Sequence, residues 1–137
     1  MASQLGKRPG ERLPDNPLWG RLISAVTDLV TAKDNANRWC GGRGERSELG
    51  FHWFWSRFPT PDMLPEVIRS RHDFRYDRCI DLNIILDDGD VITIYQIDVD
   101  VSPPRRVVEA YATSREAAAK LMLFGEAFID EIKAQMA

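Results

Sequence analysis

The most regular pattern of apolar and polar positions in this chain lies in residues 79–101, CIDLNIILDDGDVITIYQIDVDV. Apolar residues alternate with polar ones in two runs, and such alternation is typical of strands that bury one face. The dipeptide Asp88-Gly89 separates the two runs, and it readily adopts the positive φ angles of a two-residue type I′ turn. The pattern therefore predicts a β-hairpin over 79–101.

A two-residue turn at Asp88-Gly89 also predicts how the strands pair, because Asp87 then lies opposite Asp90. In this register the core face carries the pairs Ile80–Ile97, Leu82–Tyr95, Ile84–Thr93 and Leu86–Val91. The opposite face is polar at its end away from the turn, with Cys79, Asp81, Asn83, Gln96 and Asp98. We therefore expect Ile84 and Tyr95 to share the core, and Asp81 and Asp98 to share the other face.

Two segments have the three- and four-residue apolar spacing of helices. The first runs from Leu18 to about Lys33, with Asn16 or Asp15 as its cap and Pro17 at its first position. The second is a long C-terminal helix capped by Thr113 or Ser114, where Thr113 and Glu116 fit a capping box. Its apolar residues form two adjacent stripes: Ala117, Leu121, Phe124, Phe128 and Ile132, and beside them Met122, Ile129 and Met136.

The remaining segments complete an α+β fold. Residues 105–112 can return as a third strand after Pro103-Pro104, and 60–71 begin with the residues of a short helix. The aromatic residues 51–55 fit either a strand or an irregular segment that fills the core. Residues 1–14 lack periodicity and read as a flexible tail that folding does not require. We expect a single domain over 15–137, with an antiparallel sheet of three or four strands and helices packed on one face.

Composition limits the class of protein. A chain of 137 residues, 44% of them hydrophobic, is the size of one domain with one core. No apolar run approaches the roughly 20 residues that cross a bilayer, and the start of the chain lacks a signal-peptide pattern, so we expect a cytoplasmic protein without membrane contact. Two cysteines, Cys40 and Cys79, are expected to be free thiols in a reducing compartment.

A segment rich in tryptophan and arginine, 38–58, is the strongest candidate for ligand binding. Aromatic faces and guanidinium groups can stack on planar ligands or fork onto carboxylates and phosphates. The candidate binding residues are Trp39, Arg43, Arg46, Trp53, Trp55 and Arg57. The alternative is that the aromatic side chains fill the core between the first helix and the sheet, and that the arginines are surface residues.

The hairpin acids Asp81, Asp98 and Asp100 offer a second kind of site. Clustered carboxylates can hold Mg²⁺ or Mn²⁺, and a bound metal can activate water for hydrolysis of a phosphodiester. No lysine follows an acid in the pattern of restriction-type nucleases, and a solvated sheet face that resists edge aggregation explains the same residues. We therefore keep a metal-dependent hydrolase or nuclease as an alternative, with no catalytic residue assigned.

The other constellations are less specific. Cys40, His52, His72 and Cys79 have the residue types of a zinc site but not its spacings, so we expect no metal and no cofactor. Residues 1–76 carry a net charge of about +3 and 77–137 about −6, and an acidic whole argues against generic coating of nucleic acid. Six arginines near the hairpin can form a patch that binds phosphate, but we expect ion pairs with the nearby acids instead. They are Arg69, Arg71, Arg75, Arg78, Arg105 and Arg106.

No segment carries a motif that assigns the chain to a family or a reaction. The function favoured by the sequence is a small non-enzymatic binding or interaction protein, with its ligand or partner surface at 38–58. A nucleic-acid-binding domain is a further alternative. The two apolar stripes of the C-terminal helix are together broader than a small sheet requires, so we expect a homodimer through that helix, using Met122, Ile129 and Met136. The alternative is a monomer in which the first helix covers this surface.

Overall fold

The described part of the chain forms one antiparallel sheet with helices on one side. The computed structural model describes residues 10–34, 41–43, 47–58, 76–99 and 103–136, with the backbone alone at 34, 41–43, 58 and 76–78. The sheet has six strands in the order β1-β6-β5-β4-β3-β2, and every neighbouring pair is antiparallel. Its strands are β1 (Glu11–Arg12), β2 (Gly41–Arg43), β3 (Phe51–Phe58), β4 (Tyr76–Leu86), β5 (Val91–Val99) and β6 (Arg105–Ala112).

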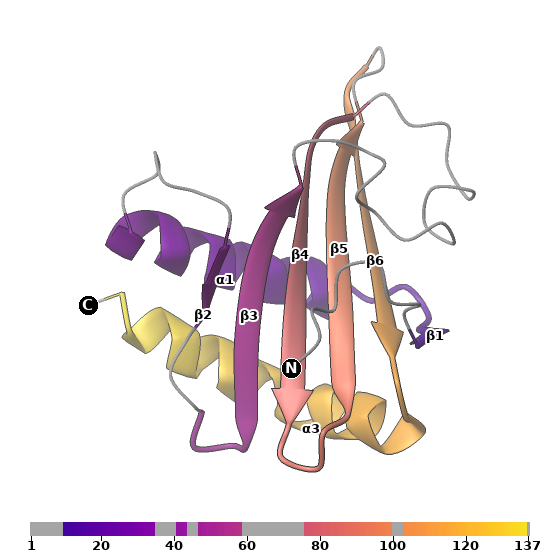
Figure 1. Ribbon diagram of the computed structural model, residues 1–137, viewed down its shortest axis with the longest axis vertical. Helices are drawn as coiled ribbons and strands as arrows, with labels where there is room; N and C mark the ends of the chain where they lie inside the picture. Colours follow the sequence, from indigo (N-terminus) through magenta and orange to yellow (C-terminus); the bar gives the residue numbers. More distant parts are fainter. Residues whose placement is uncertain (1–9, 35–40, 44–46, 59–75, 100–102, 137) are drawn as a thin grey trace.

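The two helices of the described residues cover the same face of this sheet. Helix α1 (Pro17–Asp34) and helix α3 (Arg115–Ala134) both lie behind the strands in Figure 1. Between helices and sheet lies the main core, which takes Leu22 and Val26 from α1 and Leu121, Phe128 and Ile132 from α3. The sheet contributes inward-facing residues of its central strands: Phe51, Trp53, Trp55, Ile80, Leu82, Ile84, Ile92, Ile94 and Ala110.

Close packing of α1 against α3 depends on a glycine. A Cβ added at Gly125 would lie 2.7 Å from a methyl carbon of Leu18, so the absence of a side chain lets the two helices approach. Outside this contact, the Arg21 guanidinium makes two hydrogen bonds to the Glu126 carboxylate across the helix pair. The hydrogen bonding raises the pKa of Arg21 and lowers that of Glu126.

The predicted hairpin exists, but its register differs from our prediction by one residue. Leu86 N donates to Asp90 O at 2.9 Å, and Gly89 N donates to Leu86 O at 2.9 Å, so the loop contains three residues instead of two. Gly89 has φ +94°, the left-handed position that follows a type I turn in three-residue hairpin loops. Asp88 also accepts from Asp90 N at 2.9 Å, which stabilises this loop.

Because of this change of register, each side chain of β5 points to the side of the sheet opposite to the predicted one. Ile84 pairs with Ile92 and Leu82 with Ile94, whereas Asp81 pairs with Tyr95. Because side chains alternate along a strand, a slip of one residue moves each of them to the other side of the sheet. The prediction that Ile84 and Tyr95 share the core face is therefore wrong, although both are buried.

Both helix starts use the caps that the sequence offers. Asn16 Oδ1 accepts from Leu18 N at 2.9 Å at the start of α1, as predicted. Helix α3 is capped by Ser114, whose hydroxyl accepts from Ala117 N at 3.0 Å. The capping box predicted for Thr113 and Glu116 does not form, because the Thr113 hydroxyl instead accepts from Val91 N at 2.9 Å and ties the helix start to the hairpin.

The α+β class, the antiparallel sheet and the long C-terminal helix are confirmed, but the sheet is larger than predicted. Strand β6 has the predicted bounds, 105–112. The short edge strands β1 and β2 were missed, and Glu11–Arg12 lies within the segment that we predicted to be a tail. The helix predicted over 60–71 lies outside the described residues. In the part of the chain that is described, no helix is long and apolar enough to cross a membrane.

The apolar residues of α3 divide differently from the predicted stripes. Ile129, predicted in the outer stripe, is 1% exposed and belongs to the core, whereas Phe124, predicted in the inner one, is 36% exposed. Gly125, which belongs to neither predicted stripe, is buried beside Leu18. The exposed large apolar residues of the helix are Met122, Leu123 and Phe124, and Met136, beyond its last residue, is also exposed.

Candidate functional site

One face of the sheet is covered by no helix of the described residues, and we call it the helix-free face. It carries a band of polar side chains, most of them buried. Two rows of directly paired residues cross this face, and polar or tyrosine side chains predominate in both. The first row is Phe54, Asn83, Thr93, Tyr111 and Arg12, and the second is Ser56, Asp81, Tyr95 and Glu109. We call these nine residues the polar belt.

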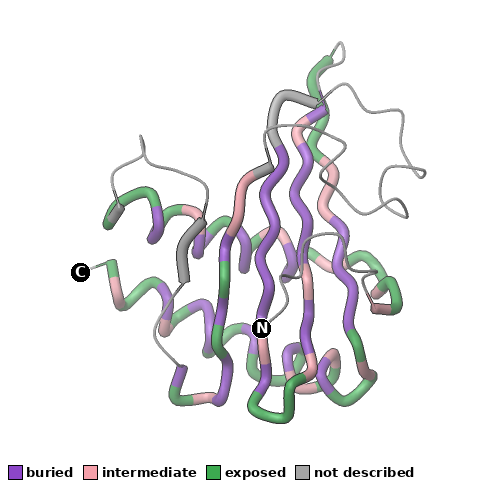
Figure 2. The backbone as a smooth tube through the Cα atoms, in the orientation of Figure 1, coloured by how far each residue is buried: buried purple, intermediate pink, exposed green. Residues whose placement is uncertain are grey.

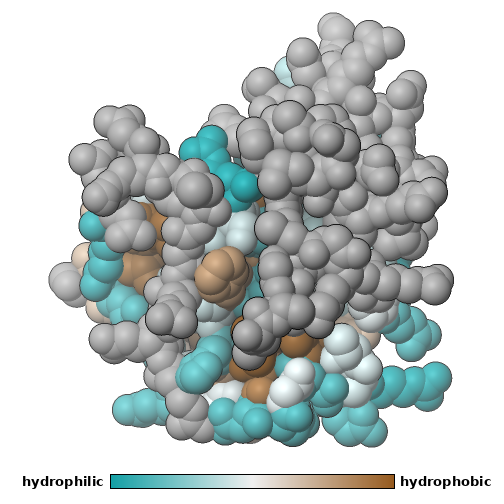
Figure 3. Space-filling view, in the orientation of Figure 1, coloured by the Kyte–Doolittle hydropathy of each residue, from teal (hydrophilic) through white to brown (hydrophobic). Residues whose placement is uncertain are grey.

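Apolar rows border the belt on both sides. The row next to Asp81 on the side away from the hairpin loop consists of Cys79, Ile97 and Val107. The row next to Asn83 on the side of the loop contains Ile85 and Val91. A second small core forms around Tyr95 and Tyr111, whose ring centroids lie 5.9 Å apart in an edge-on arrangement. As a result β4 and β5 are buried on both faces along most of their described length (Figure 2). Figure 3 looks onto this helix-free face from the same direction.

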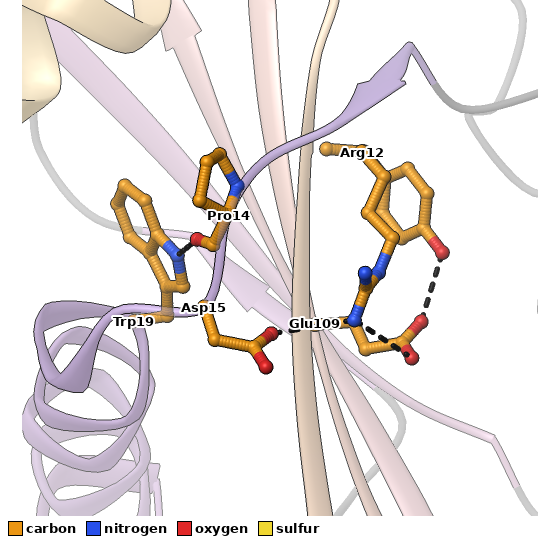
Figure 4. Close-up of polar contacts among 6 residues, drawn as sticks. Arg12, Pro14, Asp15, Trp19 and Glu109 are labelled. Carbon is orange, nitrogen blue, oxygen red and sulfur yellow. Dashed lines mark hydrogen bonds and ion pairs between the residues drawn. The ribbon is translucent and has the colours of Figure 1, made fainter.

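At the β6 end of the belt, a buried carboxylate has its partners in place. Glu109 is 3% exposed, accepts a hydrogen bond from the Tyr111 hydroxyl at 2.8 Å and lies 3.6 Å from the Arg12 guanidinium. Arg12 also reaches Asp15, and the Trp19 indole donates to Pro14 O at 3.0 Å, which fixes the chain between β1 and α1 (Figure 4). The contacts of β1 and of the segment that follows it therefore hold the Arg12 guanidinium beside the Glu109 carboxylate.

At the β4 end, a second buried carboxylate is only partly satisfied. Asp81 is 5% exposed, and its Oδ2 accepts from the Asn83 amide at 3.2 Å. Asn83 Oδ1 in turn accepts from the Thr93 hydroxyl at 2.8 Å, so the three side chains form a short hydrogen-bonded chain across β4 and β5. Asp81 Oδ1 is buried without a hydrogen-bond partner, alone among the buried side-chain oxygens and nitrogens of the described residues.

Burial dominates the electrostatics of the β4 end. It raises the pKa of Asp81 to about 7, although the hydrogen bond from Asn83 and the neighbouring Ser56 act in the opposite direction. Burial and the nearby Asp81 charge also raise the pKa values of the Cys79 thiol and the Tyr95 hydroxyl well above their usual ranges. Cys79 and Tyr95 therefore remain protonated at neutral pH, and Asp81 titrates within the physiological range.

The tryptophans proposed as ligand-binding residues point into the main core where they are described. Trp53 and Trp55 are each 4% exposed beneath the helices, and the Trp55 indole donates to the Thr27 hydroxyl at 3.0 Å. Their positions agree with the alternative that aromatic side chains fill the core. Trp39 and Arg46 lie outside the described residues, Arg43 is described only as backbone in β2, and Arg57 is partly exposed on β3.

The predicted cluster of hairpin acids does not form as predicted. In the observed register Asp81 and Asn83 point to the helix-free face, whereas Gln96 and Asp98 point to the other side. Asp98 instead pairs with Arg106 at 2.8 Å, as expected for the arginines near the hairpin. Asp100 lies outside the described residues. Within the described ranges, no three His, Cys, Asp or Glu side chains are placed to hold a metal ion.

Sequence reasoning identified Asp81 and Asn83 as neighbours but missed their burial, and it missed Glu109 and Tyr111 entirely. A signal for the second pair was present in the alternation of 105–112, where Glu109 and Tyr111 share a face and their spacing allows a hydrogen bond. Among the cysteine and histidine candidates, Cys79 is a buried free thiol, as predicted, and His52 is exposed on β3. Cys40 and His72 lie outside the described residues.

No protein-family model matches this chain, and neither a curated protein nor a solved structure shows significant similarity to it.

Proposed function

We propose that this chain is a small binding protein that catalyses no reaction, and that its binding surface is the polar belt on the helix-free face of the sheet. One observation carries this proposal: Asp81 Oδ1 is buried on that face without a hydrogen-bond partner. An unsatisfied buried acceptor costs a folded protein roughly 1–3 kcal/mol. Costs of this kind concentrate at functional sites, where a ligand supplies the missing contact.

The chemistry of the belt favours binding over catalysis. A nucleophilic cysteine needs a lowered pKa, whereas burial raises the pKa of Cys79. The Tyr95 hydroxyl is kept protonated in the same way. The belt instead offers fixed hydrogen-bonding groups and aromatic rings, which are the usual means by which a site recognises a ligand. The segment 38–58 still contributes, through Phe54 and Ser56 on the outward side of β3.

Mapping of ligand binding by NMR tests this proposal. The full chain, labelled with ¹⁵N, would be titrated with a library of small polar compounds that includes cations, anions and neutral molecules. We expect binding compounds to shift the amide signals of Asn83, Thr93 and Tyr95, and to leave those of Leu123 and Ala127 on the outer side of α3 unchanged. Shifts confined to α3, or no binding by any compound, would contradict the proposal.

We also retain the homodimer through α3 as a proposal, with a different set of residues. Ile129 belongs to the core, so the dimer surface would consist of Met122, Leu123 and Phe124, with exposed fractions of 52%, 75% and 36%. Contiguous exposed apolar residues of this size often mark contacts between proteins, and a two-fold axis is the commonest arrangement of copies.

A further inference from the structure

The two buried carboxylates of the polar belt have different partners. Glu109 receives a tyrosine hydroxyl at 2.8 Å and a guanidinium at 3.6 Å. Asp81 lies in the same row and is separated from Glu109 only by Tyr95. It receives the Asn83 amide on Oδ2 and lies beside Ser56, but no charged group pairs with it among the described residues and its Oδ1 has no hydrogen-bond partner. Since a buried carboxylate is stable only when its charge is paired, the chain itself provides that pairing at one end of the row and not at the other.

We propose that the β4 end of the belt binds a small ligand through a protonated nitrogen, an ammonium or a guanidinium, which pairs with Asp81 Oδ1 as Arg12 pairs with Glu109. This inference rests on the proposed function and specifies the ligand of the same site.

The residues around Asp81 suit such a group. Ser56 lies directly opposite Asp81 on β3, and its hydroxyl can accept a second hydrogen bond from an ammonium or guanidinium. Phe54 is diagonal to Asp81 on the same face and is 43% exposed, so its ring is accessible to the ligand. A cation over an aromatic face gains further electrostatic attraction, and diagonal neighbours in a sheet are within reach of an aromatic side chain.

Other ligand classes fit this end of the belt less well. An anion would be repelled by Asp81 and would meet no described positive side chain there, because Arg12 lies at the β6 end beside Glu109. A metal ion requires several oxygen or nitrogen ligands, and the described residues provide no such group. A single unpaired carboxylate oxygen matches one protonated nitrogen, which can donate two or three hydrogen bonds.

The proposal predicts a pH dependence of binding. A cation pairs with the ionised form of Asp81, whose pKa in the free protein is about 7, so binding should weaken as the pH falls below 7. The titratable groups that share this face are Cys79 on β4, Tyr95 on β5, Glu109 on β6 and His52 on β3. Cys79 and Tyr95 stay protonated, and His52 lies two rows from Asp81, which makes His52→Gln the necessary control variant.

The test is an NMR titration of the full chain with matched probes at constant chloride. The cations are butylammonium and methylguanidinium, their neutral counterparts are butanol and methylurea, and the anion is butyrate. We expect both cations to shift the amide signals of Asn83 and Tyr95 and the others to leave them unchanged. The affinity for the cations should fall about tenfold from about pH 8 to about pH 6, because the ionised fraction of Asp81 falls by that factor. The His52→Gln variant should show the same tenfold fall.

Substitutions then identify the carboxylate that binds the cation. Asp81→Asn should abolish cation binding, whereas Asp130→Asn, an exposed acid on α3, should leave it intact. If Asp81→Asn does not fold, Asp81→Ser provides the same comparison. Equal cation binding by wild type and Asp81→Asn would overturn this inference. Binding of only neutral or anionic compounds at the belt would also overturn it but leave the proposed function standing, whereas no binding of any library compound would overturn both.

Discussion

The buried side chains on the two faces of the sheet are stabilised by different kinds of interaction. Beneath the helices, Ile84, Leu82, Ile92 and Ile94 pack against α1 and α3, and burial of apolar surface stabilises that face without specific partners. On the helix-free face, Asp81, Asn83, Glu109 and Tyr111 are equally buried but depend on individual hydrogen bonds. An apolar face tolerates substitution by other apolar residues of similar size, whereas a buried polar face is stable only when each polar group has a hydrogen-bond partner. Among the described residues, Asp81 Oδ1 is the atom that lacks such a partner.

The largest expected effect is on the apolar face. Ile84→Ala and Ile92→Ala should each lower the free energy of unfolding by about 2–5 kcal/mol, because both residues are 0% exposed and directly paired. Thr93→Ala should cost less, about 1 kcal/mol, since it removes one hydrogen bond to Asn83. Urea denaturation measures all three. A larger loss of stability for Thr93→Ala than for Ile92→Ala would contradict the observed register and favour the one with a two-residue turn, in which Thr93 faces the core.

The second effect concerns Asp81 and depends on pH. The pKa of Asp81 is raised from 3.8 to about 7 in the folded protein, so between these values the folded state holds a proton that the unfolded state has lost. Wild-type stability should therefore fall as the pH rises from about 4 to about 7, a loss that Asp81→Asn lacks. The variant should be more stable than wild type by about 2–4 kcal/mol near pH 8 and equal to it near pH 4.

Urea denaturation of wild type and Asp81→Asn at a series of pH values provides this measurement. Asp130→Asn is the control for loss of an exposed acid, and its stability should follow that of wild type at every pH. Parallel curves for wild type and Asp81→Asn would show that folding does not raise the pKa of Asp81, which would remove the main difference that we describe between the two carboxylates.

A smaller effect is expected at the partnered end of the belt. Arg12→Ala should destabilise the protein by about 1–3 kcal/mol, because Glu109 stays buried and keeps the Tyr111 hydroxyl but loses the guanidinium. Arg12→Lys should recover part of this loss, since it restores the charge but not the fork geometry. Thermal unfolding at neutral pH compares the three proteins. Unchanged stability of Arg12→Ala would mean that the ion pair with Glu109 contributes nothing to stability.

The smallest change in stability is expected on the outer side of α3, which contacts neither face of the sheet. Leu123→Asp should change the free energy of unfolding by less than about 0.5 kcal/mol, because Leu123 is 75% exposed. If the homodimer forms, however, sedimentation equilibrium at micromolar concentration should show a dimer for wild type and the 15.6 kDa monomer for the variant. A wild-type mass equal to that of the monomer would exclude the dimer at that concentration.

Much of the fold could be predicted because its signals are local. The apolar spacing of 18–33 and the cap at Asn16 predict α1 nearly to its observed bounds, and the strand at 105–112 was predicted with its observed ends. The edge strands β1 and β2 were missed because segments of two or three residues have no periodicity, and only their pairing with β6 and β3 defines them. The candidate site was missed for a related reason, since Glu109 on β6 and Asp81 on β4 share a row only through the observed register of β5, which lies between these strands.

The sequence by itself therefore determined the α+β class, the helices at both ends and the presence of a hairpin, because each follows from a repeat of apolar residues within one segment. Only the tertiary structure decided which side of the sheet each residue of β5 faces, because Gly89 at φ +94° closes a three-residue loop that alternation alone cannot distinguish from a two-residue one. It also decided that Asp81 is buried. Alternation places Asp81 opposite the main core, but burial on that second face depends on residues such as Tyr95 that adjacent strands bring across the sheet.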